Sequence, residues 1–465
     1  MSRGRSPSPA PGKKRGGGGG GATGGDGAGA RRAAGKQQHG PEFEFGGPPG
    51  ALATMLALPV VILFLYFAAS KQYKFVFWNA GELLQQLPAD PWQLWSLKAF
   101  LVVCGWMLFH VLLERTLFAE SKLGVKLPTG ERLAYNISGH LQFWVTLLLL
   151  VHGFPTFGAD GSLKSMGAFP LSWVYDHYLQ LATGAVAFSV LMSGFLYYKS
   201  FAPGALLAAG GNTGSAVYDF FIGRELNPRL GDFDLKEFCE LRPGLIGWVV
   251  INISCAIKQY QLLGRVTPSM VMINLFQGLY VWDGLYSEAC ILSTMDITTD
   301  GFGFMLCFGD LAWVPFTYSL QARYLVENSP DLSAAQVALI CLLKLCGYAI
   351  FRGSNSQKDA FRRDPNAPEV AHLETMTTKS GSKLIVSGWW GLARKINYTG
   401  DWMMGLAWSL TTGFQTPVTY FYPIYFMVLL VHRAYRDNHA CAIKYGEDWP
   451  KYQAKVPYVF IPGVL

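Results

Sequence analysis

Residues 51–69 read ALATMLALPVVILFLYFAA, an apolar stretch without a charged side chain. At about 1.5 Å per residue in a helix, such a stretch is long enough to cross the roughly 30 Å hydrocarbon core of a bilayer. Nine further segments are apolar in the same way: 97–118, 139–157, 172–197, 243–262, 266–282, 302–324, 333–351, 401–413 and 416–431. The segment 401–413 is short and contains polar residues, as a re-entrant helix would. The pattern predicts an all-α polytopic membrane protein with about ten transmembrane helices.

The composition of the 465-residue chain agrees with this prediction. Hydrophobic residues make up 51% and charged residues only 15%, whereas soluble domains carry about 25% charged residues. This excludes an ordinary soluble enzyme, a coiled coil and a mostly disordered chain. Residues 1–50 hold eight Lys and Arg against three acidic residues, which is +5 of the net charge of +7. The remainder is nearly neutral, so we expect no nucleic acid partner for the membrane domain.

The chain divides by composition into two parts. Residues 1–40 contain a run of six Gly and several cationic residues, a composition that cannot bury enough apolar surface to fold. We therefore expect a disordered basic tail over 1–40 and a membrane domain over 41–465. The eight Cys include no C-x-x-C pair, and His439 and Cys441 lie among cationic residues, so we expect no disulfide framework and no metal site.

The distribution of Lys and Arg predicts the orientation in the membrane. Outside the tail, these residues concentrate in 352–400 and in 432–465. Eight predicted spans separate the tail from the first of these segments, and two separate the first from the second. Both numbers are even, so all three cationic segments lie on one side, which the positive-inside rule assigns to the cytosol. Both termini are therefore expected to be cytosolic.

Two groups of charged residues are candidates for a functional site. Lys358 and Arg362 are four residues apart, so they share one face of a helix, and the planar guanidinium suits phosphate oxygens. A nucleotide site and a contact with lipid headgroups both fit this cluster. Charged residues also lie in or near the apolar spans: Asp283, Glu288, Asp310 and Lys344. Charges inside a membrane usually face a cavity, although they also occur as pairs that satisfy one another.

Four stretches carry a resemblance to a known family. Residues 214–229 (GSAVYDFFIGRELNPR) and 429–446 (LLVHRAYRDNHACAIKYG) resemble the two signatures of the sterol reductases. Residues 44–48 (EFGGP) and 387–401 (SGWWGLARKINYTGD) resemble the Δ14-sterol reductase branch, which includes the sterol reductase domain of the lamin B receptor. The resemblance extends from about residue 41 to residue 465. It implies ten membrane helices, residence in the endoplasmic reticulum membrane, and an NADPH pocket that opens to the cytosol from the half of the chain at about 300–465.

Carried over position by position, the resemblance also implies the site residues. The NADPH contacts fall on Lys358, Arg362, Ile385, Trp390, Asn397, Tyr398, Arg433, Asp437, Cys441, Lys444, Tyr445 and Tyr452. Ile385 stands where the family often has Leu. The proton-relay pair falls on Tyr280 and Asp437. Asp283 and Glu288, in or near the same span as Tyr280, are then expected to line the sterol pocket.

The implied reaction is reduction of the C14=C15 double bond of a Δ8,14-sterol, by protonation at C15 followed by hydride transfer to C14. An electron-rich alkene accepts hydride only after protonation, so an acid in a dry pocket is required. Of the two relay residues, Tyr280 is preferred as the donor. Two alternatives remain open: reduction of another sterol double bond (Δ7 or Δ24(28)), and a membrane methyltransferase of the isoprenylcysteine carboxyl type. The C-terminal region resembles that of the methyltransferase, but a phosphate-directed pair at Lys358 and Arg362 favours NADPH, because S-adenosylmethionine carries no phosphate.

Overall fold

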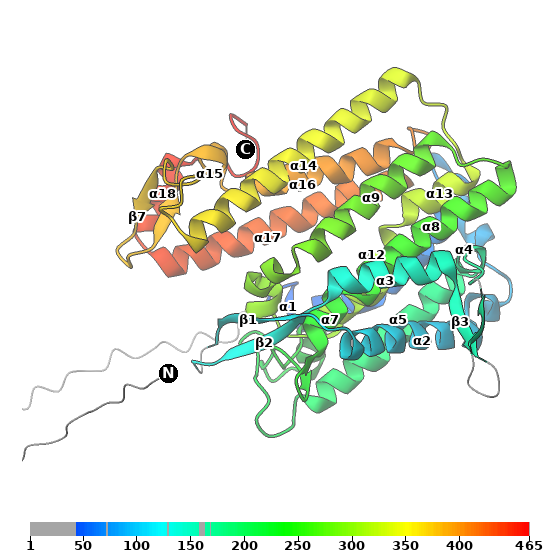
Figure 1. Ribbon diagram of the computed structural model, residues 1–465, viewed down its shortest axis with the longest axis horizontal. Coiled ribbons are helices and arrows are strands. Elements are labelled where there is room, and N and C mark those ends of the chain that lie inside the picture. The colour runs from blue at the N-terminus through cyan, green and yellow to red at the C-terminus, as the bar shows by residue number, and fades with distance from the viewer. Residues whose placement is uncertain (1–42, 71–72, 128–129, 158–162, 168, 465) are drawn as a thin grey trace, which may run out of the picture. The chain divides into compact units, whose positions relative to one another are not determined.

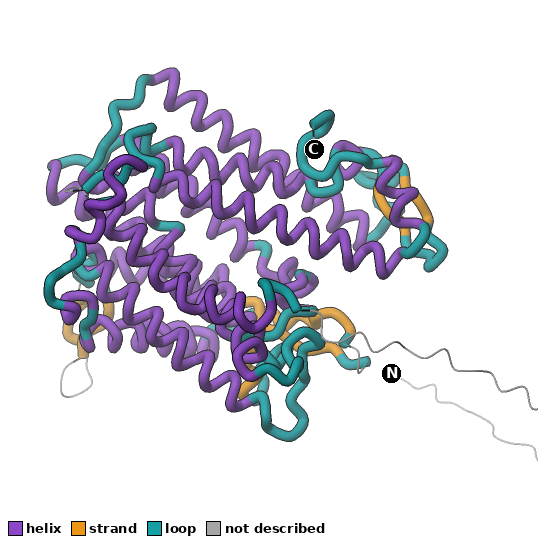
Figure 2. Tube along the Cα trace, turned by 180° about the vertical axis from the view of Figure 1, so that it is seen from behind, coloured by secondary structure: helices purple, strands orange, loops and turns teal. Residues whose placement is uncertain are grey.

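The computed structural model describes residues 43–464, apart from 71–72, 128–129, 158–162 and 168. The chain divides into two units, Met1–Glu42 and Phe43–Leu465. The predicted tail over 1–40 lies outside the described residues. The second unit is predominantly helical (Figures 1 and 2), which agrees with the predicted fold class.

The long helices coincide with the predicted apolar segments. They are α1 (Gly47–Ala68), α2 (Leu97–Thr116), α3 (Gly139–His152), α5 (Tyr178–Lys199), α8 (Pro243–Leu263), α9 (Pro268–Tyr286), α14 (Ala334–Arg363), α16 (Ile396–Leu410) and α17 (Phe421–Tyr445). Shorter helices connect them: α4 (Ser172–Asp176), α6 (Ala216–Ile222), α7 (Leu235–Leu241), α10 (Met295–Thr298), α11 (Phe304–Phe308), α12 (Val314–Thr317), α13 (Leu320–Glu327), α15 (Gly388–Leu392) and α18 (Asp448–Lys455).

Short 3₁₀- and π-helical segments and small hairpins are the remaining described elements. The 3₁₀-helical segments are η1 (Phe77–Gln86), η2 (Pro91–Leu94), η3 (Glu288–Ser293) and η5 (Val418–Tyr420), and η4 (Gly309–Trp313) is π-helical. The strands pair antiparallel two by two: β1 (Glu120–Lys126) with β2 (Arg132–Ile137), β3 (Phe154–Phe157) with β4 (Leu163–Gly167), β5 (Arg229–Leu230) with β6 (Phe233–Asp234), and β7 (Thr375–Thr377) with β8 (Lys383–Ile385).

Five helical stretches of the described residues are long and apolar enough to cross a membrane: Gly47–Ala68, Pro91–Thr116, Tyr178–Lys199, Leu235–Leu263 and Ala334–Arg363. A helical membrane protein is therefore supported, and the count of ten spans stays a prediction. The segment 302–324 is not one regular helix but the series α11, η4, α12 and α13. Pro315 lies within this series, and it has no backbone N–H to continue the helical hydrogen-bond ladder.

Helices α14 and α17 extend well beyond their apolar segments. The predicted spans end at 351 and 431, whereas the helices continue to Arg363 and Tyr445. The first parts of both cationic segments are therefore rigid helix rather than loop. Helix α16 packs against both α14 and α17, as Figure 1 shows. At the α14–α16 crossing the backbones meet at Gly347 and Gly400, where a Cβ on Gly400 would lie 2.6 Å from the Gly347 carbonyl oxygen.

Candidate functional site

A cavity of about 940 Å³ lies where the extended ends of α14 and α17 meet β8, α15, α18 and the C-terminal tail. This is near the upper end of the usual range for ligand pockets, about 300–1,000 Å³. Its charged lining residues are Lys358, Arg362, Lys383, Arg394, Lys395, Lys444 and Asp437. Six cationic side chains against one carboxylate make the cavity suited to a ligand that carries several negative charges.

Lys358 and Arg362 both line this cavity from α14, as their spacing predicts. The Lys358 Nζ lies 4.1 Å from the centroid of the Trp390 ring, in a cation–π contact. The Trp390 indole is buried and donates a hydrogen bond of 2.8 Å to the Ser354 carbonyl oxygen. Ser354 lies one turn before Lys358 on α14. This hydrogen bond therefore fixes the Trp390 ring against which the Lys358 ammonium packs.

Asp437 of α17 also lines this cavity and forms an ion pair with Lys395. The Cys441 thiol lies 3.8 Å from the same carboxylate, one helical turn further on. Burial, assisted by the nearby negative charge of Asp437, raises the pKa of the Cys441 thiol to about 11. The thiol is therefore protonated at neutral pH, so that it acts as a weak donor and not as a nucleophile.

Three aromatic side chains form a further wall of the cavity. The rings of Tyr445 and Trp449 stack with centroids 6.0 Å apart, and those of Trp449 and Tyr452 stack at 5.1 Å. The Trp449 indole donates to the Asn438 side-chain oxygen at 3.0 Å, which ties α18 to α17. Burial raises the pKa of Tyr452 to about 12, so its hydroxyl stays neutral. Such flat surfaces suit the stacking of an aromatic ligand ring.

The C-terminal tail holds the loop that carries Lys395. The backbone N–H groups of Arg394 and Lys395 donate to the carbonyl oxygens of Tyr458 and Val459 at 2.9 and 2.8 Å. The Arg394 guanidinium donates to the Val456 carbonyl oxygen at 3.0 Å. Sequence reasoning had not assigned Lys383, Arg394 and Lys395 to the site. Their charge was the available signal, but nothing in their spacing distinguishes them from other cations of 352–400.

Nine of the twelve predicted cofactor contacts line the cavity. They are Lys358, Arg362, Ile385, Trp390, Asp437, Cys441, Lys444, Tyr445 and Tyr452. The other three lie at neighbouring positions. The Asn397 amide donates to the Asn355 side-chain oxygen at 3.3 Å, the Tyr398 ring centroid lies 5.6 Å from the Lys395 Nζ, and Arg433 pairs with Asp296 at 2.9 Å.

The two predicted relay residues have different surroundings. Tyr280 of α9 packs edge-on against Trp408, with ring centroids 5.1 Å apart, and against Trp248 with centroids 6.2 Å apart. Asp437 contacts Lys395 and Cys441 in the cavity described above. A relay between Tyr280 and Asp437 stays a prediction. Asp401 had not been singled out, because it ends the stretch 387–401, which carries several polar residues.

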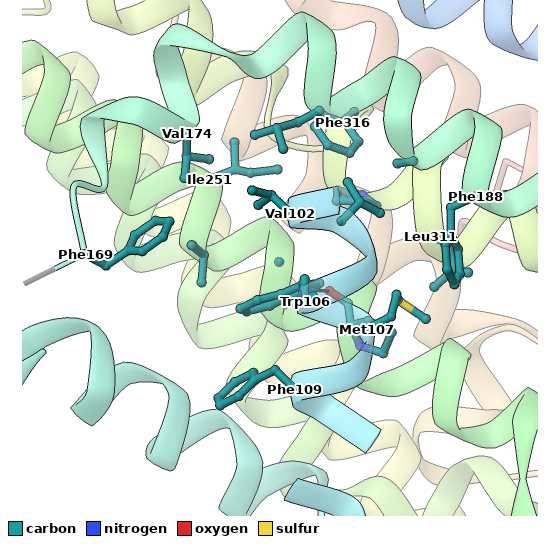
Figure 3. A pocket seen from close by; sticks show the side chains of 18 of the residues that line it. Val102, Trp106, Met107, Phe109, Phe169, Val174, Phe188, Ile251, Leu311 and Phe316 are labelled. Atoms are coloured by element: carbon teal, nitrogen blue, oxygen red, sulfur yellow. Dashed lines mark hydrogen bonds between the residues drawn. The ribbon is translucent and has the colours of Figure 1, made fainter. Parts of the chain in front are cut away.

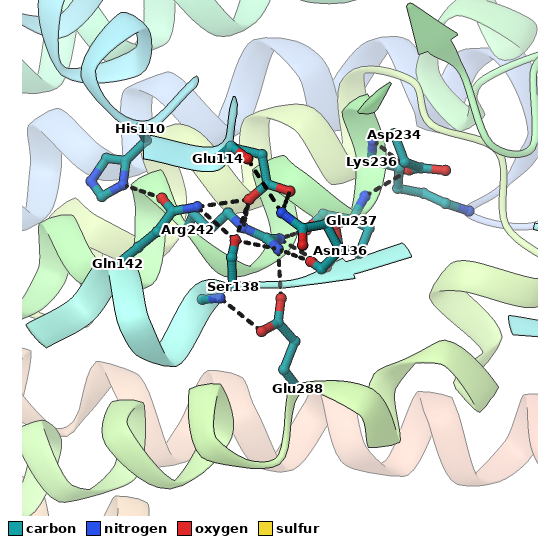
Figure 4. Close-up of polar contacts among 11 residues, drawn as sticks. His110, Glu114, Asn136, Ser138, Gln142, Asp234, Lys236, Glu237, Arg242 and Glu288 are labelled. Atoms are coloured by element: carbon teal, nitrogen blue, oxygen red, sulfur yellow. Dashed lines mark hydrogen bonds and ion pairs between the residues drawn. The ribbon is translucent and has the colours of Figure 1, made fainter. Parts of the chain in front are cut away.

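Asp283 and Glu288, expected near the substrate, both take part in ion pairs. Asp283 pairs with Arg352 and accepts a hydrogen bond of 3.0 Å from the Tyr348 hydroxyl. Glu288 contacts the fully buried Arg242 at 2.6 Å and accepts a hydrogen bond from the backbone N–H of Gly139 (Figure 4). Their predicted role as pocket residues stays a prediction.

Arg242 is the centre of a buried charge cluster. Its guanidinium is fully buried and forms ion pairs with three carboxylates, Glu114 at 2.9 Å, Glu237 at 2.8 Å and Glu288 at 2.6 Å. These come from α2, α7 and η3, and Figure 4 shows them converging on the one guanidinium. The cluster therefore joins three elements that are distant in the sequence.

The two signature stretches meet at α10 and the turn that follows it. The Asn227 amide, from the first signature, donates to the Ile297 carbonyl oxygen at 3.3 Å. From the second, Arg433 pairs with Asp296 at 2.9 Å and Arg436 pairs with Asp300 at 2.8 Å. These contacts set the position of α17 along its axis, and hence where Asp437 stands in the cavity.

A second, smaller cavity of about 390 Å³ lies among α2, α5, α8, η4 and α12 (Figure 3). Its walls are almost entirely apolar and include Val102, Trp106, Phe188, Ile251 and Phe316. The Trp106 indole N–H is already engaged by the Pro243 carbonyl oxygen at 2.9 Å. An apolar ligand suits these walls. None of the site residues predicted from the sequence is among those that line it.

Comparison with known proteins matches residues 39–465 to the model of the ergosterol biosynthesis ERG4/ERG24 family. The chain is 45% identical over 440 residues to Delta(14)-sterol reductase ERG24 of Candida albicans, covering 90% of this chain and 97% of the fungal protein. It is 46% identical over 428 residues to Delta(14)-sterol reductase TM7SF2 of Mus musculus, covering 90% and 97%. It is 45% identical over 425 residues to Delta(14)-sterol reductase LBR of Gallus gallus, covering 90% of this chain and 64% of the avian protein.

Proposed function

The chain belongs to the ergosterol biosynthesis ERG4/ERG24 family, and we propose that it is a Δ14-sterol reductase of sterol biosynthesis. Relatives named Delta(14)-sterol reductase are 45–46% identical to the chain over nine tenths of its length. The observation within the chain that carries the proposal is the cavity with six cationic side chains and an aromatic wall. The substrate is a Δ8,14-sterol, and its C14=C15 double bond is reduced in the endoplasmic reticulum membrane, with both termini of the enzyme in the cytosol.

The side chains of the larger cavity fit NADPH. Lys358, Arg362 and the neighbouring cations would hold its phosphate groups, and Trp390 with the stacked rings of α17 and α18 would hold its aromatic rings. When bound, this cofactor supplies the hydride that the sterol carbon C14 receives. The chain's own contribution is to bind, to orient and to deliver a proton.

Tyr280 is the proposed proton donor, and Asp437 has a positioning role. The alkene must first gain a proton at C15, which leaves a cation at C14. Asp437 Oδ2 accepts a hydrogen bond from the Lys395 ammonium, so this carboxylate holds a cation at the cavity. Tyr280 lies among aromatic rings, which stabilise a neighbouring positive charge.

A reduction assay with defined sterols tests the proposal. Microsomes that contain the protein are given NADPH and a Δ8,14-sterol, and loss of the conjugated-diene absorbance is followed, with product analysis by mass spectrometry. We expect a Δ8 product. Reduction of a Δ5,7-diene or of a Δ24(28)-sterol instead would assign the enzyme to another sterol double bond. Methyl transfer from S-adenosylmethionine to a prenylated cysteine would support the methyltransferase alternative.

Lys358→Ala and Arg362→Ala are expected to weaken NADPH binding about 10- to 100-fold while sterol binding is unchanged. Each loses a charge-assisted contact worth roughly 1.5–3 kcal/mol. Titration of NADPH against detergent-solubilised protein measures the effect. Arg363→Ala is the matched control, because Arg363 is the next residue on α14 but is exposed and pairs with Asp359. Equal NADPH affinities for all three variants would contradict the assignment.

Removal of residues 1–40 is expected to leave insertion and turnover unchanged. None of the site residues precedes residue 41. The contacts described for the start of the chain involve Glu44 and Phe45, which the truncated protein keeps. Glu44 pairs with Arg436 at 2.7 Å, and the Phe45 ring packs on Phe221. A truncated protein that inserts correctly and is inactive would place the domain boundary elsewhere. Removal of residues 1–45, which also deletes Glu44, should lower the thermal stability.

A further inference from the structure

Lys344 is an unusual residue for the middle of an apolar helix. It lies on α14, where its side chain is 2% exposed, and its Nζ has no hydrogen-bond partner among the described residues. The ammonium instead lies 5.7 Å from the ring centroid of Tyr280, 5.5 Å from that of Trp408 and 6.0 Å from that of Phe276. Burying a charge in a membrane domain is costly, and such charges usually serve a function.

Asp401 supplies a second buried polar atom beside the same tyrosine. Its Oδ1 is buried without a hydrogen-bond partner in the described part of the chain. Asp401 lies seven residues before Trp408 on α16 and therefore on the same face of that helix, and the Trp408 ring contacts both Tyr280 and the Lys344 ammonium. Three groups from three helices, α9, α14 and α16, therefore form one cluster: Tyr280, Lys344 and Asp401.

The backbone holds this cluster in place. Gly347 is one turn after Lys344 on α14, and Gly400 directly precedes Asp401 on α16. These two glycines form the close crossing of the two helices, where neither position has room for a Cβ. This crossing holds α14 and α16 at close approach, next to the positions of Lys344 and Asp401.

We infer that Lys344 and Asp401 are positioning residues for the proton that Tyr280 delivers to the sterol, an inference that rests on the proposed function. Asp401 orients the Tyr280 hydroxyl, and the Lys344 ammonium stabilises the phenolate that remains. In the step, the O–H bond of Tyr280 breaks and its electron pair stays on oxygen. The proton forms a bond to C15 with the alkene π electrons, which leaves the cation at C14.

The net charge of the cluster changes by one unit in this step. With Lys344 protonated, Asp401 ionised and Tyr280 neutral, the three groups carry no net charge before transfer and −1 after it. The negative charge arises opposite the sterol cation, and the ammonium over the Tyr280 ring opposes it directly. One proton from water then restores Tyr280. A purely structural role for Lys344 would need only the aromatic contacts and would leave turnover unaffected once the protein has folded.

Lys344→Met and Asp401→Asn test the inference in the full-length enzyme. At saturating NADPH, we expect each to slow reduction of the Δ8,14-sterol about 10- to 100-fold, with NADPH affinity unchanged. Lys344→Arg keeps the charge and should recover part of the rate. Lys98→Met is the matched control: Lys98 also lies near an aromatic ring, 5.2 Å from the Trp173 centroid, but on α2, and its loss should leave turnover unchanged.

The combination with Tyr280→Phe separates a positioning role from a structural one. If Lys344 and Asp401 act through Tyr280, adding either substitution to Tyr280→Phe should slow the enzyme no further. Additive losses, or wild-type turnover of Lys344→Met, would overturn the inference. If Lys344→Met fails to insert, the nearly isosteric Asp401→Asn is used instead: wild-type turnover, or a loss additive with Tyr280→Phe, would overturn the inference. A wild-type enzyme that does not reduce Δ8,14-sterols would instead overturn the proposed function.

Discussion

Tyr280→Phe is expected to lower the rate of sterol reduction by about 10²–10⁴, the usual loss when a general acid is removed. The substitution removes only the hydroxyl, so the ring keeps its packing against Trp408 and Trp248 and the protein should still insert. NADPH affinity should be unchanged, because Tyr280 is not among the residues that line the cationic cavity. The measurement is the rate at saturating NADPH, with a separate titration of the cofactor.

Asp437→Asn should also abolish turnover, but with a different binding phenotype. Asp437 lies in the cavity and forms an ion pair with Lys395, so its loss frees that lysine and is expected to change NADPH affinity. Combining the two substitutions should not multiply their effects if both residues serve one proton transfer. Near-normal turnover of Tyr280→Phe would show that another group is the acid, and Asp283 or Glu288 would then be tested in the same way.

Arg242→Met is expected to destabilise the protein by about 3–5 kcal/mol, because it leaves buried carboxylates without their counter-charge. Glu114, Glu237 and Glu288 all pair with this one guanidinium, whose side chain is fully buried. The expected result is loss of folded protein, seen as a lower yield of monodisperse material and a lower unfolding temperature in detergent.

Arg115→Met is the matched control for this prediction. Arg115 also pairs with a carboxylate, Asp232 at 2.8 Å, but the two side chains are 47% and 84% exposed. Exposed pairs contribute only about 0–1 kcal/mol, so the unfolding temperature should hardly change. Equal unfolding temperatures for Arg242→Met and Arg115→Met would show that the buried cluster does not hold α2, α7 and η3 together.

Properties that depend on local periodicity were accessible from the amino-acid sequence. The apolar segments predicted a helical membrane protein, because length and hydropathy decide whether a segment suits a bilayer. The i, i+4 spacing of Lys358 and Arg362 predicted a shared face, and both line the cavity. The resemblance added Trp390, Asp437 and Cys441. The sequence analysis did not predict where α14 and α17 end. Beyond the membrane the residues of a helix become polar, so the hydropathy falls although the helix continues.

Contacts between distant helices were decided by the tertiary structure alone. The three carboxylates around Arg242 come from residues 114, 237 and 288, and nothing in the sequence pairs them. Lys344 was visible as a charge in an apolar span, but its aromatic neighbours lie on α9 and α16. Hydropathy and helical spacing specify which side of a helix is polar. Which side chains meet across helices depends on how closely the backbones approach, here at Gly347 and Gly400, and that is a property of the packed bundle.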